Sequence, residues 1–346
     1  MKSTRARLRS RHAVIGDFDA GVAPPRIARV RAELERPLWS VMIPTYNCAR
    51  YLRQTLQSVL AQDPGPAAMQ IEVVDDVSTL DDPEAIVREI GPGRVAFFRQ
   101  PINRGSTANF NTCLERSRGE LVHILHGDDF VGPEFYTQIG AAAAAYSRTA
   151  AFFTRCWVVD EEGQLESVAP RIRPLEKPTR NTTPLHQTNT LYTPGVVLRR
   201  AFYERAGGFI PTLVHCADWE MWVRAISQSG GLMLNEVLAS YRFFAGNETN
   251  RFARSAENIR DRLRLAAILS KRFSDFDYAL CERTLARQAL RQMQRFAAAG
   301  DRTGALANQE IYHRLAPPAR RRLLRQWDRE IGIKPAARPP ASRSQP

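Results

Sequence analysis

Short apolar runs alternate with amphipathic segments over residues 39–129, and this alternation constrains the fold more than any other feature of the chain. Runs with the length and composition of strands lie at 39–44, 71–74, 94–99 and 120–125. Apolar residues at helical spacing fill the segments between them, at 49–62, 83–90 and 107–116. Strands separated by helices of this length form βαβ units. We therefore expect an α/β fold with a doubly wound, mostly parallel sheet.

Two adjacent carboxylates, Asp128 and Asp129, follow the fourth predicted strand after His126 and Gly127. Ligands of doubly wound sheets bind outside the carboxyl ends of the strands, which is where this pair lies. Mg²⁺ or Mn²⁺ is held in proteins by one or two carboxylates together with substrate phosphates. A metal ion there would neutralise a departing diphosphate. The alternative interpretation is a turn that favours Gly and Asp for its backbone conformation.

Polar residues also follow the first two predicted strands. Thr45 and Tyr46 come after the first strand, and Asp75 and Asp76 come after the second. Because neighbouring parallel strands end at the same edge of a sheet, these side chains are expected near the acidic pair. An aromatic ring there can stack on a nucleobase, and a carboxylate can accept its imide N–H. Taken alone, the same residue types also suit turns and helix caps.

Asp218, Trp219 and Glu220 stand at the start of a predicted helix over 218–229. Carboxylates at a helix N-terminus are stabilised by the helix dipole, by about 0.3–1 kcal/mol, which is the structural interpretation. The functional interpretation is a general base that removes a proton from an attacking hydroxyl. The spacing alone leaves both interpretations open.

Composition divides the chain into four regions. They are a basic N-terminal extension at 1–37, the α/β domain at 38–250, an Arg-rich helical region at 251–334 and a disordered tail at 335–346. The further predicted elements are strands at 151–159, 195–199 and 232–244, helices at 200–208 and 218–229, a loop from 164 to about 190, and a helix–turn–helix pair at 280–316.

The net charge of +13 is concentrated on the two flanks of the chain. Residues 1–40 contribute +5 and residues 251–346 contribute +12, whereas residues 41–250 contribute −4. The mildly acidic middle disfavours nucleic acid as the partner. The basic flanks predict either peripheral contact with an anionic membrane or a solvated, Arg-rich helical face.

The cysteines and the apolar runs bear on the compartment. Five cysteines are scattered without a C-x-x-C pair, and no apolar run reaches the roughly 18–20 residues that span a bilayer. We therefore expect a cytoplasmic protein, peripheral at most on the inner face of the membrane. Arginine outnumbers lysine by 45 to four, which is compatible with a GC-rich bacterial gene.

Taken together, the order and spacing of these segments resemble family 2 of the glycosyltransferases, enzymes with the GT-A fold. The resemblance covers about residues 39–245 and rests on W-S-V-M-I-P-T-Y-N, I-E-V-V-D-D-V-S-T, N-R-G-S-T-A-N, L-H-G-D-D-F-V-G-P-E-F, V-V-L-R-R-A-F-Y-E-R-A-G-G-F and A-D-W-E-M-W-V-R. It implies an inverting enzyme that transfers a sugar from a nucleoside diphosphate sugar, expected to be a UDP-sugar, to a hydroxyl of a glycan or lipid-linked acceptor. The expected setting is bacterial polysaccharide or glycolipid assembly.

The resemblance also implies a nucleotide site at the ends of the first two strands and in the segment after the third. Its members are Thr45, Tyr46, Asp75, Asp76, Arg104 and Asn109. Thr45 and Tyr46 would hold the base, and Asp76, with Asp75 beside it, would bond to uracil or a similar base. Arg104 and Asn109 would lie over the nucleotide.

For the reacting groups, the resemblance implies that Asp128 approaches the ribose or the sugar. Asp129 would ligate the divalent metal ion, Mn²⁺ or Mg²⁺. Asp218 matches the position of the catalytic base, and inversion by direct displacement requires one base and no covalent intermediate.

Two positions depart from the pattern of the family. Val77 stands where many members carry Gly. Phe244 stands where many carry a His that assists the metal or the diphosphate, so that contact is lost or moves to Arg242, Asn247 or Arg251. The two arginines are candidate diphosphate ligands, because a guanidinium can bind phosphate in a bidentate manner.

Three other functions compete with this interpretation. A sugar-nucleotide nucleotidyltransferase needs a Gly-rich phosphate loop with a basic residue after the first strand, and a dinucleotide oxidoreductase needs G-x-G-x-x-G there; residues 45–48 supply neither. A catalytically inactive nucleotide-sugar-binding module of the same fold is the third. The joint presence of the acidic residues weighs against it: Asp76, Asp128, Asp129 and Asp218.

Overall fold

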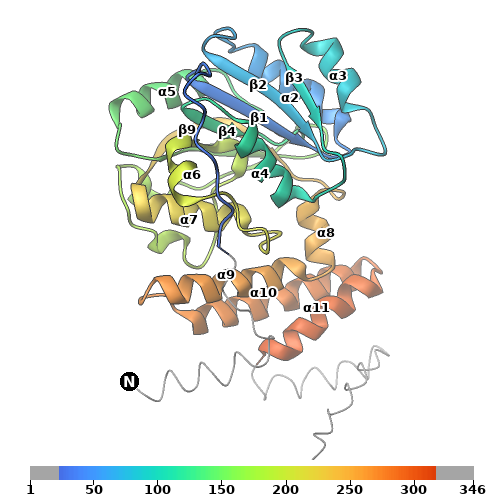
Figure 1. Cartoon of the computed structure of the whole chain (residues 1–346). Helices are drawn as coiled ribbons and strands as arrows, with labels where there is room; N and C mark the ends of the chain where they lie inside the picture. The colour runs from blue at the N-terminus through green and yellow to red at the C-terminus, as the bar shows by residue number, and fades with distance from the viewer. Residues whose placement is uncertain (1–22, 317–346) are drawn as a thin grey trace, which may run out of the picture.

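The structure, a computed structural model, describes residues 23–316 (Figure 1). The predictions for the chain before residue 23 and for the tail at 335–346 lie outside the described residues. Within the described part, the sheet and its covering helices form the upper part of the view in Figure 1, and the last helices lie beneath them.

A nine-stranded sheet lies at the centre, in the order β3-β2-β1-β4-β8-β6-β9-β5, with β7 paired to β6. The strands are β1 Trp39–Thr45, β2 Met69–Asp75, β3 Ala96–Arg99, β4 Leu121–Ile124, β5 Phe130–Val131, β6 Ala151–Val159, β7 Leu165–Val168, β8 Val196–Arg199 and β9 Gly231–Arg242. The first four are parallel to one another, and β9 is parallel to β6. β8 runs antiparallel to both β4 and β6, which makes the sheet mixed. The expected α/β class is confirmed.

Hydrophobic clusters cover both faces of the sheet. Successive side chains of a strand point to opposite faces, so Val41 and Ile43 of β1 join one cluster and Met42 joins the other. Every residue of β1 is buried, because this strand has neighbours on both edges and helices on both faces. The first face is covered by α2 Ala49–Leu60, α3 Pro83–Ile90 and α5 Phe135–Ala145, and the second by α4 Ser106–Arg116, α6 Arg200–Ala206 and α7 Ala217–Ser229.

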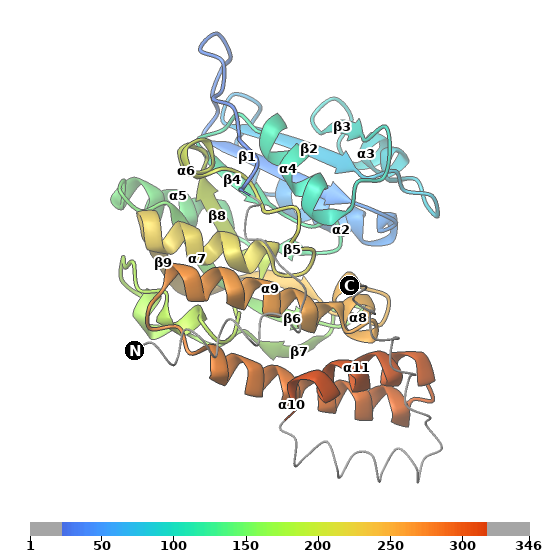
Figure 2. The same cartoon turned by 60° about the horizontal axis from the view of Figure 1, so that its bottom comes forward.

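The last helices form an outer layer against α7 (Figure 2). They are α8 Glu248–Arg254, α9 Glu257–Arg272, α10 Tyr278–Ala298 and α11 Arg302–Leu315. Asp277 and Asp301 cap α10 and α11 by accepting backbone N–H groups, and Gly300 with φ +73° makes the turn between them. The helix–turn–helix pair expected at 280–316 is therefore confirmed.

The hydrophobic cluster that contains Met42 and covers the second face continues from the sheet into this outer layer. Val223 of α7, Leu265 of α9 and Leu285 of α10 belong to it and are at most 1% exposed. The predicted domain boundary at residue 250 remains a prediction, but the buried cluster extends across that point.

Several elements differ from the sequence-based expectations. β7 lies in the segment expected to be a loop, and its short, exposed L-E-S-V run shows no periodicity by which it could be recognised. α8 begins at Glu248, before the Arg-rich helical region predicted at 251–334. Val77 adopts φ +64°, a left-handed conformation that β-branched residues rarely adopt and that glycine adopts freely.

Candidate active site

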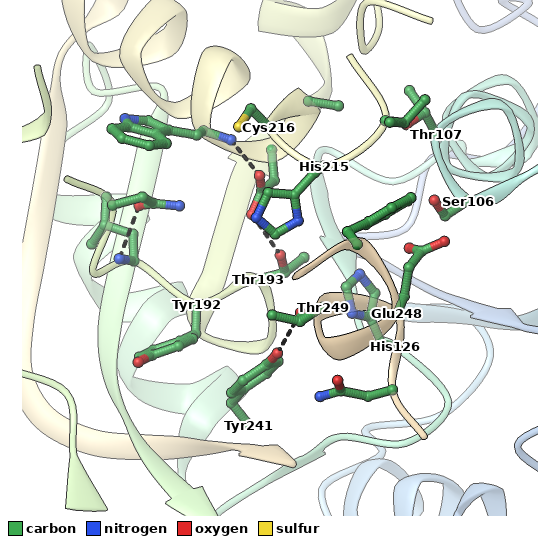
Figure 3. Close-up of a pocket in the computed structure, with 18 of the residues that line it drawn as sticks. Ser106, Thr107, His126, Tyr192, Thr193, His215, Cys216, Tyr241, Glu248 and Thr249 are labelled. Carbon is green, nitrogen blue, oxygen red and sulfur yellow. Dashed lines mark hydrogen bonds between the residues drawn. The ribbon is translucent and has the colours of Figure 1, made fainter. Parts of the chain in front are cut away.

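A pocket of about 330 Å³ lies between the carboxyl ends of the strands and the C-terminal helices. In Figure 3, Ser106, His126 and Glu248 lie on one side of this pocket and Tyr192 lies on the other. Residues from distant parts of the chain line it, including Ser106, His126, Asp128, Thr193, Asp218, Arg242, Glu248, Arg262 and Gln288. The pocket therefore brings the acidic pair's strand end and the start of α7 into one cavity.

Asp218 lies in the first turn of α7 and faces the pocket. One of its carboxylate oxygens accepts the N–H of Trp219 at 2.6 Å, and the other accepts the hydroxyl of Thr193 at 3.4 Å. Burial raises the pKa of Asp218 to about 6, against the lowering effect of these two hydrogen bonds. Its position and its pKa are suited to a general base near neutral pH.

Glu220, the second carboxylate of the same turn, has a different environment. It is fully buried and forms an ion pair with Arg224, one turn further along α7, and with Arg272 of α9. Arg224 also donates to the carbonyl oxygens of residues 206–208 at the end of α6. Glu220 and Arg224 together therefore join α7 to α6 and α9, whereas Asp218 is the carboxylate of this turn that lines the pocket.

The backbone just before Asp218 is held by a residue of α9. Asp261 is completely buried, and its Oδ2 accepts the backbone N–H groups of His215 and Cys216, each at 2.7 Å. Its other oxygen accepts a bond from Arg264 at 3.0 Å. A carboxylate at the beginning of α7 satisfies donors that the helix leaves free. The charge of Asp261 also acts to raise the pKa of Asp218.

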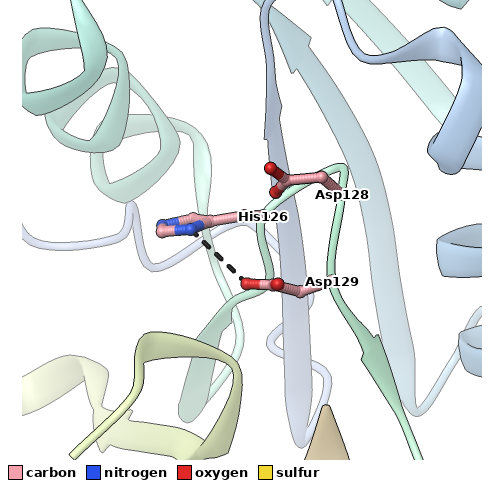
Figure 4. Close-up of side chains that lie close together, drawn as sticks. All are labelled: His126, Asp128 and Asp129. Atoms are coloured by element: carbon pink, nitrogen blue, oxygen red, sulfur yellow. Dashed lines mark ion pairs between the residues drawn. The ribbon is translucent and has the colours of Figure 1, made fainter. Parts of the chain in front are cut away.

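The end of β4 carries a group of three possible metal ligands, His126, Asp128 and Asp129 (Figure 4). One ligand atom of each lies within 4.8 Å of the others. His126 Nδ1 lies 3.6 Å from Asp129 Oδ2, and the ring of His126 stacks on Phe110. Burial raises the pKa of Asp128 to about 6 and lowers that of His126 to about 4, because each charged form is poorly solvated.

Arg242, at the end of β9, holds the acidic loop in place. Its backbone N–H donates to Asp129 Oδ1 at 2.8 Å, and its Nε donates to the carbonyl oxygen of Asp128 at 3.0 Å. The remaining guanidinium nitrogens bond to Gln54 and to the carbonyl oxygens of residues 160–161. All three side-chain nitrogens thus have protein partners. The predicted contact of Arg242 with a diphosphate remains a prediction.

The ends of β1 and β2 are joined by hydrogen bonds. Thr45 lies opposite Asp75 in the parallel register and donates to it at 3.3 Å, and Asp75 also accepts from Ser78 and Arg99. Asp75 is completely buried, whereas Tyr46, next to Thr45, is 44% exposed. At this edge, the exposed ring of Tyr46 is therefore open to contact, and the carboxylate of Asp75 supports the turn.

Asp76 orders the segment that leads into α4. Its two oxygens accept the backbone N–H groups of Arg104 and Gly105, each at 2.8 Å. Gly105 has φ +81°, a conformation that favours glycine, and Ser106 begins the helix and lines the pocket. The Asp76 loop therefore adjoins the pocket.

The other predicted site residues are distributed unequally around the cavity. Asp128, Asp218 and Arg242 line it. Asn109 is 2% exposed and bonds to the carbonyl oxygen of Val74, so it lies behind the Asp76 loop. The remaining predicted residues lie outside the pocket lining: Thr45, Tyr46, Asp75, Asp76, Arg104, Asp129 and Arg251.

At the position of the family's histidine, Phe244 packs its ring against Tyr51 at 5.2 Å. Asn247 lines the pocket and caps α8 by accepting the N–H of Asn250. Arg251 is exposed and pairs with Glu248 at 2.8 Å. The imidazole that does lie beside the acidic pair is that of His126, two residues before Asp128.

Sequence reasoning missed several residues of this site, among them His126, Asp261 and Arg262. His126 could have been found, because a histidine just before Gly-Asp-Asp at a strand end is a possible metal ligand. Asp261 and Arg262 lie in an Arg-rich helix, and no local pattern distinguishes them from the solvated charges around them. Their positions follow only from the packing of α9 on α7.

Comparison with known sequences relates the chain to sugar-transferring enzymes. A family model described as glycosyl transferase family 2 matches residues 40–207. An uncharacterized protein of Mycobacterium tuberculosis is 30% identical over 243 residues, which are 66% of this chain and 75% of that protein. An uncharacterized glycosyltransferase of Rickettsia prowazekii is 25% identical over 239 residues, which are 67% of this chain and 72% of that protein.

Among solved structures, S. aureus TarS (residues 1–349) in complex with UDP has a similar fold. The TM-score is 0.50 at 18% sequence identity, and the match covers 81% of this chain and 92% of that one. The match extends past the region of the family model, since 81% of the chain exceeds residues 40–207. The likeness supports the assignment of the GT-A fold.

Proposed function

Since the chain belongs to glycosyl transferase family 2 and is a glycosyltransferase, we propose that it transfers a sugar from a nucleoside diphosphate sugar to an acceptor hydroxyl with inversion. Asp218 serves as the general base in this proposal. A divalent cation, Mn²⁺ or Mg²⁺, is held at the end of β4. The observation that carries the proposal is that Asp128 and Asp218 line the same pocket.

The residues at the end of β4 fit a divalent cation. His126 Nε2 and Asp129 Oδ2 are buried without a hydrogen-bond partner among the described atoms, which is costly unless a ligand completes them. Together with Asp128 they offer one nitrogen and two carboxylate oxygens, a donor set that suits Mn²⁺. When bound, the cation neutralises the charge that develops on the departing diphosphate. His126 supports the site where Phe244 supplies no ligand.

Asp218 is suited to accept a proton from the acceptor hydroxyl. As that proton moves to the carboxylate, the hydroxyl oxygen bonds to the anomeric carbon of the donor sugar, and the bond from this carbon to the diphosphate oxygen breaks. Attack from the face opposite the leaving group inverts the anomeric centre. Thr193 and the N–H of Trp219 hold the carboxylate of Asp218 in place for this step.

We assign the nucleotide to the edge formed by β1 and β2, next to the pocket. The exposed ring of Tyr46 can stack on the base, and Asp76 presents the loop that leads to Ser106 at the pocket wall. Thr45, Asp75 and Asn109 are buried and support these segments by hydrogen bonds. Arg104 is exposed next to Asp76, and we propose that its side chain meets a phosphate or the ribose. The proposed base is uracil, and the TarS structure contains UDP.

The acceptor in this proposal is a glycan or a lipid-linked glycan of a bacterial surface polymer. No helix within residues 23–316 is long and apolar enough to cross a bilayer. We propose a cytoplasmic enzyme that contacts the anionic inner face of the membrane through its basic flanks.

A thermal-shift screen of nucleoside diphosphate sugars with and without Mn²⁺ tests this proposal, because a ligand of the native state raises its stability. The donor so identified should support transfer, and Asp218→Asn should reduce transfer by at least about a hundredfold with little change in donor affinity. Transfer retained in Asp218→Asn would remove this residue from the mechanism. Nucleotide binding without turnover by the unaltered protein would instead indicate the inactive binding module.

A further inference from the structure

The C-terminal helices form one wall of the pocket. Arg262 of α9 and Gln288 of α10 line it, next to residues 188–189 of the preceding loop. Arg262 lies over the ring of Trp219, the residue after Asp218, and all three line the pocket. The donor nucleotide is assigned to the ends of β1 and β2, whose predicted site residues lie outside this lining. In the proposed function, the wall formed by the C-terminal helices is therefore the one that faces the acceptor.

All the described partners of Arg262 are uncharged. Its Nη1 donates to Gln288 Oε1 at 2.5 Å and its Nη2 to the carbonyl oxygen of Gln187 at 2.8 Å. Its guanidinium carbon lies 5.2 Å from the centroid of the Trp219 ring. Its Nε is buried without a described partner. The guanidinium is thus held in one orientation by neutral groups, and its charge is uncompensated.

The other described arginines of α8 and α9 all have carboxylate partners within 4 Å. The pairs are Arg251–Glu248, Arg254–Asp301, Arg260–Glu257, Arg264–Glu257 and Asp261, and Arg272–Glu220. Among these six arginines, the one that lines the pocket is also the one without a described carboxylate partner. A ligand-binding wall explains why the pocket-lining arginine lacks a described carboxylate partner, whereas a solvated Arg-rich helix gives no reason for it.

Asp218 does not act as the carboxylate partner of Arg262. The oxygens of that carboxylate accept from Trp219 and Thr193, and no ion pair links it to Arg262. Burial lowers the pKa of Arg262, because the charged guanidinium is poorly solvated. Burying a charge without a partner is unfavourable, and an anionic ligand would compensate for it. Because Gln288 and Gln187 fix its orientation, the guanidinium loses little freedom on binding one.

We propose that the acceptor carries an anionic group, a carboxylate or a phosphate, and that Arg262 binds this group while the acceptor hydroxyl lies at Asp218. The inference rests on the proposed function, since that function assigns this wall of the pocket to the acceptor. It narrows the acceptor class to acidic glycans and to phosphate-bearing glycans or glycolipids.

The test compares small acceptor mimics that differ in charge. Methyl glucuronide, glucose 6-phosphate and methyl glucoside are titrated against the protein with UDP and Mn²⁺ present, and binding is followed by ligand-observed NMR. We expect at least one anionic mimic to bind about tenfold more tightly than the neutral glucoside, since a hydrogen bond to a charged group has about this effect. The two anionic mimics distinguish a carboxylate from a phosphate. Equal binding of all three would overturn the inference.

Variants locate the preference on one side chain. Arg262→Gln should remove the preference for the anionic mimic, and Arg262→Lys should retain part of it. Arg260→Gln is the matched control, because Arg260 lies on the same helix, pairs with Glu257 and does not line the pocket. A preference that survives in Arg262→Gln would contradict the inference. If Arg262→Gln fails to fold, Arg262→Lys takes its place. Loss of the anionic preference in Arg262→Lys would indicate that the guanidinium group is required, and full retention would indicate that a positive charge is sufficient. Loss of the preference in the control Arg260→Gln would overturn the assignment to Arg262.

UDP affinity and Mn²⁺-dependent donor hydrolysis are measured on the same samples. UDP affinity should be unchanged in Arg262→Gln, because the nucleotide is assigned to the ends of β1 and β2 and Arg262 belongs to α9. Absence of donor binding or hydrolysis in the unaltered protein would count against the proposed function. Loss of the charge preference in Arg262→Gln with UDP affinity retained would concern the acceptor wall alone.

Discussion

At the scale of single residues, the first turn of α7 shows how two like side chains acquire different tasks. Asp218 and Glu220 are two positions apart, which places them on different faces of the helix. Glu220 meets Arg224 and Arg272 in a buried ion pair, while Asp218 meets a hydroxyl and a backbone N–H at the pocket. Burial raises the pKa of Asp218 to about 6 against the lowering effect of these two hydrogen bonds, and a raised pKa is the property that a general base needs near neutral pH.

The pH dependence of transfer should report this residue. With a pKa of about 6, Asp218 is protonated and unable to accept a proton at lower pH, so kcat/KM should fall as the pH decreases through that value. Thr193→Val removes a hydrogen bond that favours the carboxylate, and it should move the acidic limb upward by about half a pH unit. The measurement is kcat/KM against pH for both proteins. Coincident limbs would show that Thr193 does not act on the base.

At the scale of elements, α9 acts as the support of α7. Asp261 accepts the last two backbone N–H groups before α7, and Arg272 pairs with Glu220 one turn into it. Contacts of this kind position the base from a part of the chain that the sequence assigned to a separate helical region. We therefore expect substitutions in α9 to alter catalysis without touching the donor.

Asp261→Asn tests that support. An amide oxygen in place of Oδ2 can still accept both N–H groups, but the negative charge and the acceptor for Arg264 are lost, so we expect a loss of about 1–3 kcal/mol in the free energy of unfolding and a reduced kcat. Because the charge of Asp261 raises the pKa of Asp218, the acidic limb should move to lower pH, opposite to the effect of Thr193→Val.

Asp301→Asn is the control for Asp261→Asn, since Asp301 caps α11 and pairs with Arg254 away from the pocket. It should lower stability and leave the pH profile in place. An unshifted limb in Asp261→Asn, with stability lowered to the same extent, would reduce Asp261 to a structural role.

At the scale of the whole molecule, the outer helical layer lies at the opposite end from α3 (Figure 1). Exposed arginines recur every fourth residue along α10, at Arg283, Arg287 and Arg291. A helix face of this kind suits an anionic lipid surface, at about 1 kcal/mol per arginine near the headgroups. Because α9 and α10 also contribute to the core and to the pocket wall, this surface has to be tested by charge reversal, since deletion of these helices would disturb the site.

Reversal of Arg287 and Arg291 to Glu should weaken binding to vesicles that contain phosphatidylglycerol at low salt by at least about tenfold. The matched control is reversal of Arg88 on α3 and of Arg118 after α4, two exposed residues on the sheet side, which gives the same change in net charge. Sedimentation with vesicles measures both. Equal losses in the two variants would indicate a response to net charge, and no loss in either would end the membrane hypothesis.

The sequence by itself determined the order of strands and helices, the sheet edge that carries the site, and the family. It did so because apolar periodicity is a local property and because parallel strands direct their carboxyl ends to one edge. Asp76, Asp128 and Asp218 could be identified from that edge and from the resemblance, and their catalytic roles remain predictions.

Only the tertiary structure decided which of these side chains meet in a pocket and what surrounds them. Arg262 and Asp261 lie more than 40 residues beyond Asp218 in the sequence. The spacing of arginines in a helix does not show which of them faces the site, because that depends on the residues packed against it. His126 is likewise recognised as a possible metal ligand only because it lies beside Asp129 Oδ2, which has no described hydrogen-bond partner. Local pattern specifies elements, whereas the environment of a charge is set by the helices and strands that pack against it from distant parts of the chain.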